Sequence, residues 1–302
     1  MKVVITGANG AVGHAILLRQ ESGATDSPVE LVAAVRSERA VKELPPLRDS
    51  QIARISYEDV SSLRAALGGA SAVIHLAGLL VLRRGSTYEK ANVETTRNVA
   101  EAARIGAVQK IVYVSAIGAN AASSNGYFRS KGQAEGIVRA CGCAYTILRV
   151  PLLLGPRTEG AAALQRHLLR SVVLLPGGGR NLQQPLDVAD LACAALRAAD
   201  PPVARNRALD LVGPVSLPDR EIVQRAASLS GRAVKIRSIP VGLAKIVLAI
   251  SQSMGRTGLS PDVLEVITAN TRQDPTPAAT ELGIRLTGLD EMLTRSLGEI
   301  RT

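Results

Sequence analysis

The sequence of 302 residues is poor in aromatic residues and in cysteine, and it has no long uncharged apolar run. It contains no Trp and only one Phe, which argues against a nucleic-acid surface built on base stacking. No apolar run approaches the ~20 residues of a transmembrane helix, so none is predicted. The cysteines are three, an odd number without metal-type spacing, and we expect reduced structural thiols and no metal site: Cys141, Cys143 and Cys193.

Basic charge is what the sequence has in excess, with a net charge of +10 from 36 Lys and Arg. Because these residues are spread along the chain, we favour a basic soluble enzyme over a surface for anionic lipid headgroups, and peripheral membrane contact stays open. Met1 leads directly into the first predicted strand, which leaves no room for a targeting peptide. We therefore expect a cytoplasmic protein, with no nucleic-acid partner.

The first twenty residues combine a short apolar run with a glycine turn that opens a helical pattern. Glycines recur at every third position, at Gly7, Gly10 and Gly13. They have no Cβ to block a pyrophosphate, and the first-turn N–H groups of a helix lack partners, so the turn indicates a dinucleotide site. Gly13 would let the helix pack closely on the strand, and an ordinary strand-to-helix turn is the alternative. The candidate cofactor residues here are Thr6, Gly7, Asn9, Gly10, Ala11, Val12 and Gly13.

Apolar segments alternate with helical patterns through the first half of the chain, which predicts an α/β fold with a doubly wound parallel sheet. Ligands of such sheets bind at the carboxyl ends of the strands. The predicted strands cover residues 3–5, 30–35, 51–55, 71–78, 110–115 and 143–149, and a strand at 208–212 is expected to rejoin the sheet. One rim would then carry Gly7, Arg36, Ala77, Gly78 and Ser115.

The end of the second predicted strand bears on cofactor choice. Arg36 stands where an acidic residue would accept hydrogen bonds from the adenosine ribose, and an arginine there can pair with a 2′-phosphate. We therefore favour NADP, with NAD possible and Arg39 as a second phosphate candidate. The alternative is that Arg36 only ends a strand at the surface. Asp59, followed by Val60, either lies beside the adenine or caps a helix.

A tyrosine and a lysine follow the fifth predicted strand. Tyr127 and Lys131 are four residues apart in a helical pattern, which places them on one face. The ammonium would favour the phenolate and lower the pKa of Tyr127 from its usual ~10, as general acid–base catalysis requires. Asn92 is expected to face inward from a helix at 86–105, and His75 to be packed in the core.

Together these motifs resemble the extended or atypical branch of the short-chain dehydrogenase/reductase superfamily, whose members have a Rossmann fold that binds NAD(P). Residues 127–135, 148–156 and 184–191 are similar to bacterial relatives of the nucleotide-binding accessory subunit of respiratory complex I. The resemblance covers nearly the whole chain. It implies that Tyr127 exchanges a proton with a substrate hydroxyl or carbonyl and that Lys131 holds the nicotinamide ribose. It also implies that Ser115 orients the substrate oxygen and that Asn92 and Pro151 lie at the cofactor.

We expect residues 1–150 to form the dinucleotide-binding domain and residues 151–302 a smaller, mostly helical substrate lobe, from which 183–213 returns to the sheet. An apolar segment at 241–250 either roofs the substrate pocket or lies on a membrane surface, and either role suggests a hydrophobic partner or substrate.

The leading hypothesis is an NADP-dependent oxidoreductase that acts on a hydroxyl or carbonyl of a small molecule. Ala116 and Ile117 stand where active extended members usually carry the hydroxyl, so an accessory NAD(P)H-binding protein of a membrane respiratory complex is the alternative. A nucleotide-sugar epimerase or dehydratase, using the same residues, is a lesser one. The sequence does not indicate an oligomeric state.

Overall fold

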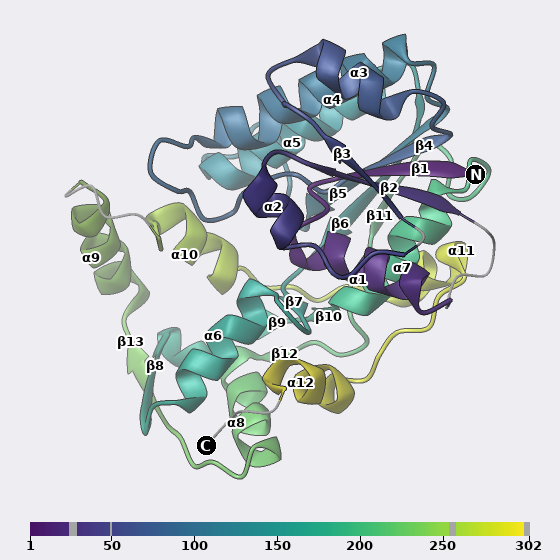
Figure 1. Ribbon diagram of the computed structural model, residues 1–302. Coiled ribbons are helices and arrows are strands. Elements are labelled where there is room, and N and C mark those ends of the chain that lie inside the picture. The colour runs from purple at the N-terminus through teal and green to yellow at the C-terminus, as the bar shows by residue number, and fades with distance from the viewer. Residues whose placement is uncertain (24–28, 49, 254–257, 299–302) are drawn as a thin grey trace.

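A seven-stranded parallel sheet forms the centre of the computed structural model, which describes residues 1–23, 29–48, 50–253 and 258–298 (Figure 1). Its strand order is β11-β6-β5-β4-β1-β2-β3, and all neighbours run parallel. The doubly wound α/β prediction is confirmed, including the late strand that rejoins the sheet beside β6. The strands are β1 (Lys2–Thr6), β2 (Glu30–Val35), β3 (Gln51–Arg54), β4 (Ala72–His75), β5 (Lys110–Ala116), β6 (Ala144–Val150) and β11 (Arg207–Asp210).

Helices cover both faces of this sheet, which explains why its strands are apolar without alternation. Along β1, Val3 and Ile5 pack toward one face and Val4 toward the other, and all three are fully buried. The first face is covered by α1 (Ala11–Glu21), α7 (Val188–Ala199) and α11 (Thr276–Leu282). The second face is covered by α3 (Val60–Leu67), α4 (Thr95–Ile105) and α5 (Gly126–Ala140).

The helix predicted at 86–105 begins later and differently. It starts with a π-helical turn, η1 (Glu89–Glu94), which continues into α4. The hydroxyl of Thr95 donates to the carbonyl of Lys90 at 2.8 Å, and that of Thr96 to the carbonyl of Asn92 at 2.6 Å. Threonine hydroxyls that bond to backbone carbonyls of the preceding turn compete with regular helical bonding. The π turn places Asn92 in the interior.

The C-terminal elements form a second body below the sheet (Figure 1). Their core combines α6 (Glu159–Leu168), α8 (Asp219–Leu229) and α12 (Leu289–Leu297). The region is helical as predicted, but it also contains three two-stranded sheets that the sequence analysis missed. These pair β7 (Leu153–Leu154) with β10 (Leu186–Asp187), β9 (Leu182–Gln183) with β12 (Leu217–Pro218), and β8 (Val172–Pro176) with β13 (Lys235–Ile239).

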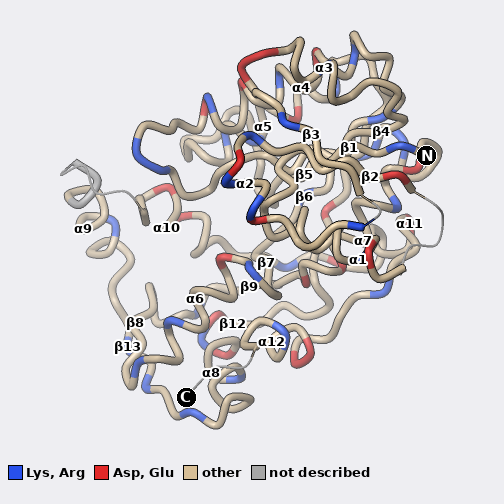
Figure 2. The backbone as a smooth tube through the Cα atoms, viewed as in Figure 1, with Lys and Arg blue, Asp and Glu red and all other residues tan. Residues whose placement is uncertain are grey.

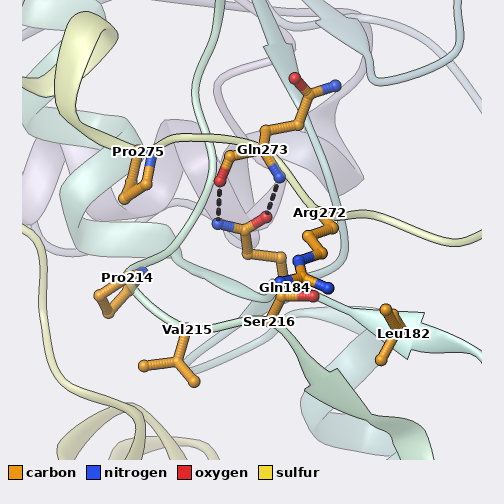
Figure 3. A pocket seen from close by; sticks show the side chains of 8 residues that line it. All are labelled: Leu182, Gln184, Pro214, Val215, Ser216, Arg272, Gln273 and Pro275. Atoms are coloured by element: carbon orange, nitrogen blue, oxygen red, sulfur yellow. Dashed lines mark hydrogen bonds between the residues drawn. The ribbon is translucent and has the colours of Figure 1, made fainter.

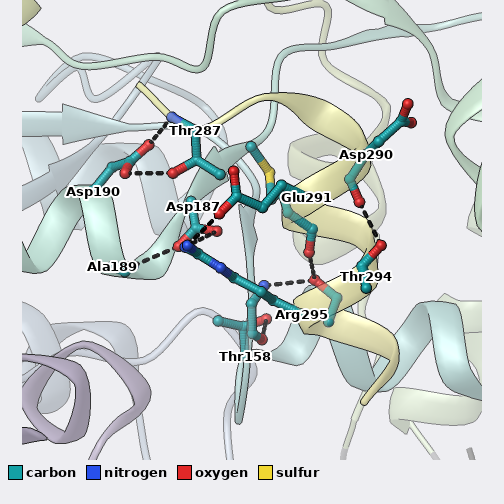
Figure 4. A network of polar contacts seen from close by, with 12 residues as sticks. Thr158, Asp187, Ala189, Asp190, Thr287, Asp290, Glu291, Thr294 and Arg295 are labelled. Carbon is teal, nitrogen blue, oxygen red and sulfur yellow. Dashed lines mark hydrogen bonds and ion pairs between the residues drawn. The ribbon is translucent and has the colours of Figure 1, made fainter. Parts of the chain in front are cut away.

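Buried carboxylates join α12 and the preceding loop to α7 (Figure 4). Asp187 caps α7 by accepting from the N–H of Ala189 at 2.7 Å, and it pairs with Arg295 at 3.4 Å. Asp190 accepts from the N–H and the hydroxyl of Thr287 at 2.7 and 2.8 Å. These contacts fix the C-terminal body against the sheet.

The remaining helices are α2 (Glu38–Lys42), α9 (Val241–Ser253) and α10 (Pro261–Thr268), with a 3₁₀ turn, η2, at Gly177–Gly179. In Figure 1, α9 and α10 lie at the left side of the molecule, and α10 contacts both α9 and α5. Among the described residues, no helix is long and apolar enough to cross a membrane.

Candidate functional site

The glycine turn after β1 is shaped by two close backbone approaches. Gly7 has a φ of +77°, and a Cβ there would lie 3.0 Å from the backbone nitrogen of Ala77, in the turn after β4. A Cβ on Gly13 would lie 2.4 Å from the carbonyl oxygen of Ala8. Gly13 therefore lets α1 pack closely on the turn that follows β1. At Gly10 the nearest atom is 3.4 Å away, so this exposed position leaves the mouth of the turn open.

The amino end of α1 offers unpaired donors to an anion. Gly10 is the N-cap, it provides no side-chain cap, and the first turn carries no acidic residue. The first intrahelical bond runs from the N–H of His14 to the carbonyl of Gly10, so the N–H groups of residues 11–13 have no partner in the helix. Together with the open face at Gly10, these donors fit a diphosphate. Asn9 is fixed beside them by a 2.9 Å bond to Glu43.

Arg36 lies exposed at the end of β2. Its guanidinium carbon is 5.8 Å from the centre of the Tyr57 ring, and within the described residues it makes no ion pair. Its neighbours are already paired, Arg39 with Glu43 at 3.2 Å and Glu38 with Arg54 at 2.7 Å. Arg36 is therefore available to an anionic group, whereas Arg39 is engaged.

A cavity of about 300 Å³ opens beside Arg36 and Tyr57. Tyr57, which the sequence analysis missed, lies three residues after the end of β3, and burial raises its pKa to about 12. Asp59 does not line the cavity, because it caps α3 by accepting from the N–H of Ser61 at 2.9 Å. Of the two roles left open for Asp59, the cap is the one observed. Other lining residues are Ile55, Ser56, Glu58, Leu79, Gly85, Ser86, Lys90, Ala91, Glu94, Thr95 and Asn98.

Asn92 ties the turn after β4 to α5. Its side chain accepts from the N–H of Leu79 at 2.8 Å and donates to the hydroxyl of Ser130 at 2.9 Å. A Cβ on Gly78 would lie 2.9 Å from the Asn92 oxygen and 3.7 Å from the Nζ of Lys131. Asn92 is fully buried, as predicted, and it brings Gly78 and Lys131 together.

Lys131 is directed at the backbone of β5. Its Nζ donates to the carbonyl of Val114 at 2.7 Å and lies 4.3 Å from the centre of the Tyr113 ring. Burial lowers its pKa to about 7, and the carboxylate of Glu135 opposes that shift. Burial therefore makes Lys131 much easier to deprotonate than a lysine in water.

Tyr127 lies at the start of α5, which Asn125 caps by accepting from the N–H of Tyr127 at 3.1 Å. Its ring meets that of Tyr88 edge to face, with centroids 5.9 Å apart. Burial raises the pKa of Tyr127 well above its usual value, and Tyr88 adds to the shift. The prediction that Lys131 lowers this pKa is wrong, because desolvation dominates the shift and the Nζ of Lys131 is bonded to the carbonyl of Val114.

Ser115 is bonded to a buried carboxylate. Its hydroxyl donates to Glu135 at 2.7 Å, and the guanidinium of Arg149 binds the same carboxylate through two bonds of 2.8 and 2.7 Å. Glu135 is 1% exposed. The sequence analysis missed this residue, although its position four residues after Lys131 places it on the same helical face. The hydroxyl of Ser115 is thus not free to orient a substrate here.

The other predicted residues have simpler surroundings. Thr6 bonds to Nδ1 of His75 at 2.6 Å, and His75 is fully buried with its pKa lowered to about 3 by desolvation, which confirms its core position. Val12 lies in the first turn of α1, Val60 begins α3, and Pro151 directly follows β6.

A second cavity, of about 460 Å³, contains none of the predicted site residues (Figure 3). Its buried amide, on Gln184, is bonded to the backbone of Gln273 by contacts of 2.9 and 2.8 Å, and also to the carbonyl of Gly213. The nitrogen and the oxygen of that amide already have hydrogen-bond partners within the chain. We therefore place the candidate site at the other location, the rim that carries the glycine turn and Tyr127.

Comparison with known proteins supports this location. A model of the family described as NAD(P)H-binding matches residues 7–198, from the glycine turn to α7. The fold is shared with an NADPH-dependent quinone oxidoreductase from Escherichia coli, solved with NADPH, at a TM-score of 0.74 and 21% identity over 98% of this chain and 100% of that one.

Two curated relatives match at moderate identity. Subunit 9 of the NADH dehydrogenase [ubiquinone] 1 alpha subcomplex, mitochondrial, from Arabidopsis thaliana, is 24% identical over 81% of this chain and 62% of its own length. A ceramide reductase from Caulobacter vibrioides is 29% identical over 57% of this chain and 54% of its own length. The chain thus spans less than two thirds of the length of these relatives.

Proposed function

Because this chain belongs to the NAD(P)H-binding family, we propose that it is an NADP(H)-dependent oxidoreductase of the short-chain class that reduces a carbonyl of a small, hydrophobic substrate. The observation that carries this proposal is the position of Tyr127 and Lys131 four residues apart on α5, with the Nζ of Lys131 beside Gly78 in the turn after β4. The bound nicotinamide would supply the hydride. The relatives named for quinone and ceramide reduction agree with a hydrophobic substrate.

The glycine turn and Arg36 would hold the cofactor. The free N–H groups of α1 would hold the diphosphate, and the guanidinium of Arg36, which makes no ion pair within the described residues, would bind the 2′-phosphate beside the cavity at Tyr57.

Tyr127 would provide the proton. Its raised pKa keeps the phenol protonated at neutral pH, which suits a donor to the oxygen of a carbonyl under reduction. Lys131 in its charged form favours the phenolate left after that transfer.

Turnover by the Tyr127→Phe variant tests the catalytic proposal. NADPH oxidation is followed with a panel of ketones and quinones, and NADPH binding by calorimetry. The wild type should oxidise NADPH, and the variant should bind it equally well while its rate falls at least about 100-fold, the usual contribution of a general acid. Equal rates in both proteins would remove Tyr127 from the chemistry.

The cofactor assignment has its own test in Arg36→Asp. Loss of the cation and gain of a repelling carboxylate should change the ratio of NADPH to NADH affinity at least about 10-fold in favour of NADH. Arg39→Asp is the matched control and should change it less, because Arg39 is paired with Glu43. If the ratio stays the same in Arg36→Asp, the 2′-phosphate is bound elsewhere.

A second candidate function is an accessory protein that binds NADPH without turnover. It is favoured by the hydrogen bond that the Ser115 hydroxyl donates to Glu135, because that hydroxyl is then not available to donate to a substrate oxygen. The curated relative from a NADH dehydrogenase complex agrees with it. Tight NADPH binding with no oxidation by any acceptor in the panel would favour this function.

A further inference from the structure

One face of α9 exposes four large aliphatic side chains. They follow the helical spacing i, i+3, i+4 and i+7, and each is 54–59% exposed: Leu243, Ile246, Val247 and Ile250. We call these four residues the α9 patch. The opposite side of the helix, with Ala244 and Leu248, is half-buried, and α9 contacts α10. Apart from Lys245, residues 241–250 of α9 are apolar, and the helix is covered on one side only, so the side chains of Leu243, Ile246 and Val247 are left in contact with solvent.

The small sheet that precedes α9 extends this surface. Val172 and Leu174 on β8 are 43% and 52% exposed. Their register partners on β13 are Lys235 and Arg237, both exposed. Paired residues in neighbouring strands point to the same face, so two cations stand beside two aliphatic side chains. Figure 1 shows β8, β13 and α9 in succession along one side of the molecule.

The two chain segments that contain β8, β13 and α9 carry basic residues and no acidic ones. Residues 160–186 contain three Arg and residues 222–253 contain five Lys or Arg, and neither segment contains Asp or Glu. Figure 2 shows the basic residues on α9 and β13 and the acidic ones on α10. One of these, Glu265, pairs with Lys245 at 3.8 Å, whereas Lys235 and Arg237 make no ion pair within the described residues.

We propose that the α9 patch, with Lys235 and Arg237, docks on the surface of an anionic lipid bilayer. The aliphatic side chains enter the boundary between headgroups and acyl chains, and the cations meet the headgroup phosphates. A second copy of the chain fits less well, since a two-fold contact would set the same basic surface against itself. The proposal does not depend on hydride transfer.

The docking surface is joined to the candidate site through α10. The side chain of Asn125, at the start of α5, donates to the carbonyl of Asp262 at 3.0 Å. A Cβ on Gly126 would lie 2.8 Å from the Asp262 carboxylate and 3.0 Å from the Tyr88 ring, which packs on Tyr127. A docked molecule therefore holds the start of the Tyr127 helix near the bilayer.

Vesicle flotation of the full chain tests the docking. The vesicles contain phosphatidylcholine alone or with about 30% phosphatidylglycerol, at low and high salt. The wild type should float with the anionic vesicles, less so at high salt, and not with the neutral ones. Ile246→Ser combined with Val247→Ser should reduce partitioning at least about tenfold. Lys235→Gln combined with Arg237→Gln should reduce it roughly 30-fold.

Matched controls use exposed residues on other surfaces. Ile105→Ser removes an aliphatic side chain on α4 that is 45% exposed, and Arg64→Gln with Arg97→Gln removes two exposed cations on α3 and α4. These should float like the wild type. The proposal is overturned if the wild type ignores anionic vesicles, if controls and patch variants lose binding equally, or if the patch variants instead convert a dimer into a monomer. NADPH binding, measured in parallel, should be unchanged in every variant.

Discussion

The two ends of the candidate site differ in how far their polar groups are already satisfied. At the glycine turn, the first N–H groups of α1 have no partner in the helix, and the guanidinium of Arg36, which lies over the Tyr57 ring, makes no ion pair within the described chain. At the start of α5, Lys131 is bonded to Val114 and Ser115 to Glu135. The glycine-turn end, which we call the open end, can accept an anion without rearrangement. The α5 end, which we call the closed end, must exchange internal hydrogen bonds before it can act on a ligand.

The open end depends on backbone contacts that tolerate no side chain, and Gly13→Ala tests this most directly. A Cβ at this position meets three backbone atoms of Ala8 within 2.4–2.7 Å. We expect the free energy of unfolding to fall by about 3 kcal/mol in urea denaturation, with weaker NADPH binding.

Gly136→Ala is the matched control for that substitution. Gly136 is an exposed position in α5, and no atom lies within 4 Å of the place that a Cβ would occupy, so alanine should stabilise the protein by about 0.5–1 kcal/mol. A Gly13→Ala protein as stable as the wild type would show that α1 can move away from the strand, and the rigid open turn would be refuted.

The closed end predicts a pH dependence of stability that comes from Lys131. Its pKa is about 7 in the folded protein, against ~10.4 in an unfolded chain. Between these values the unfolded state binds more protons, so the contribution of Lys131 to stability rises with pH, by up to about 1.4 kcal/mol per unit. Below pH 7 both states are charged and the contribution is constant.

Unfolding of Lys131→Met, compared with the wild type from pH 6 to 9.5, measures this contribution. The gain in the free energy of unfolding of Lys131→Met over the wild type should shrink as the pH rises above 7, because the wild-type lysine then loses its buried charge. Lys42→Met, at an exposed position of α2, should run parallel to the wild type. Parallel curves for Lys131→Met as well would mean that the lysine is not held in a buried, desolvated state.

The open end could be predicted from the sequence because it is made of local signals. The glycine spacing belongs to the unit of β1, turn and α1, and Arg36 directly follows the next strand, β2, so all these signals lie within a short stretch of the sequence. The small C-terminal sheets gave no such signal, since strands as short as Leu153–Leu154 and Leu186–Asp187 are too short to show alternation.

For the closed end, the residues that take part could be predicted from the sequence, but the contacts that they make could not. The four-residue spacing correctly placed Tyr127 and Lys131 on one helix. The orientation of the ammonium depends on the carbonyl of Val114 and on Glu135, and the hydroxyl of Ser115 depends on the Glu135 and Arg149 pair. These are tertiary contacts between β5, β6 and α5, and no local pattern encodes them.

Asp59→Ala tests whether the open end extends to the loop after β3. Of the changes considered, apart from the controls, it should have the smallest effect on stability and on NADPH affinity. The carboxylate accepts from the N–H of Ser61 and caps α3, and it does not line the cavity beside Arg36. Loss of an N-cap typically costs about 1 kcal/mol, so the midpoint of urea unfolding should shift modestly while NADPH affinity changes less than about twofold. Asp59→Asn retains the acceptor and should restore the stability. A large loss of NADPH affinity in both variants would instead place Asp59 at the adenine and extend the open end to the loop after β3.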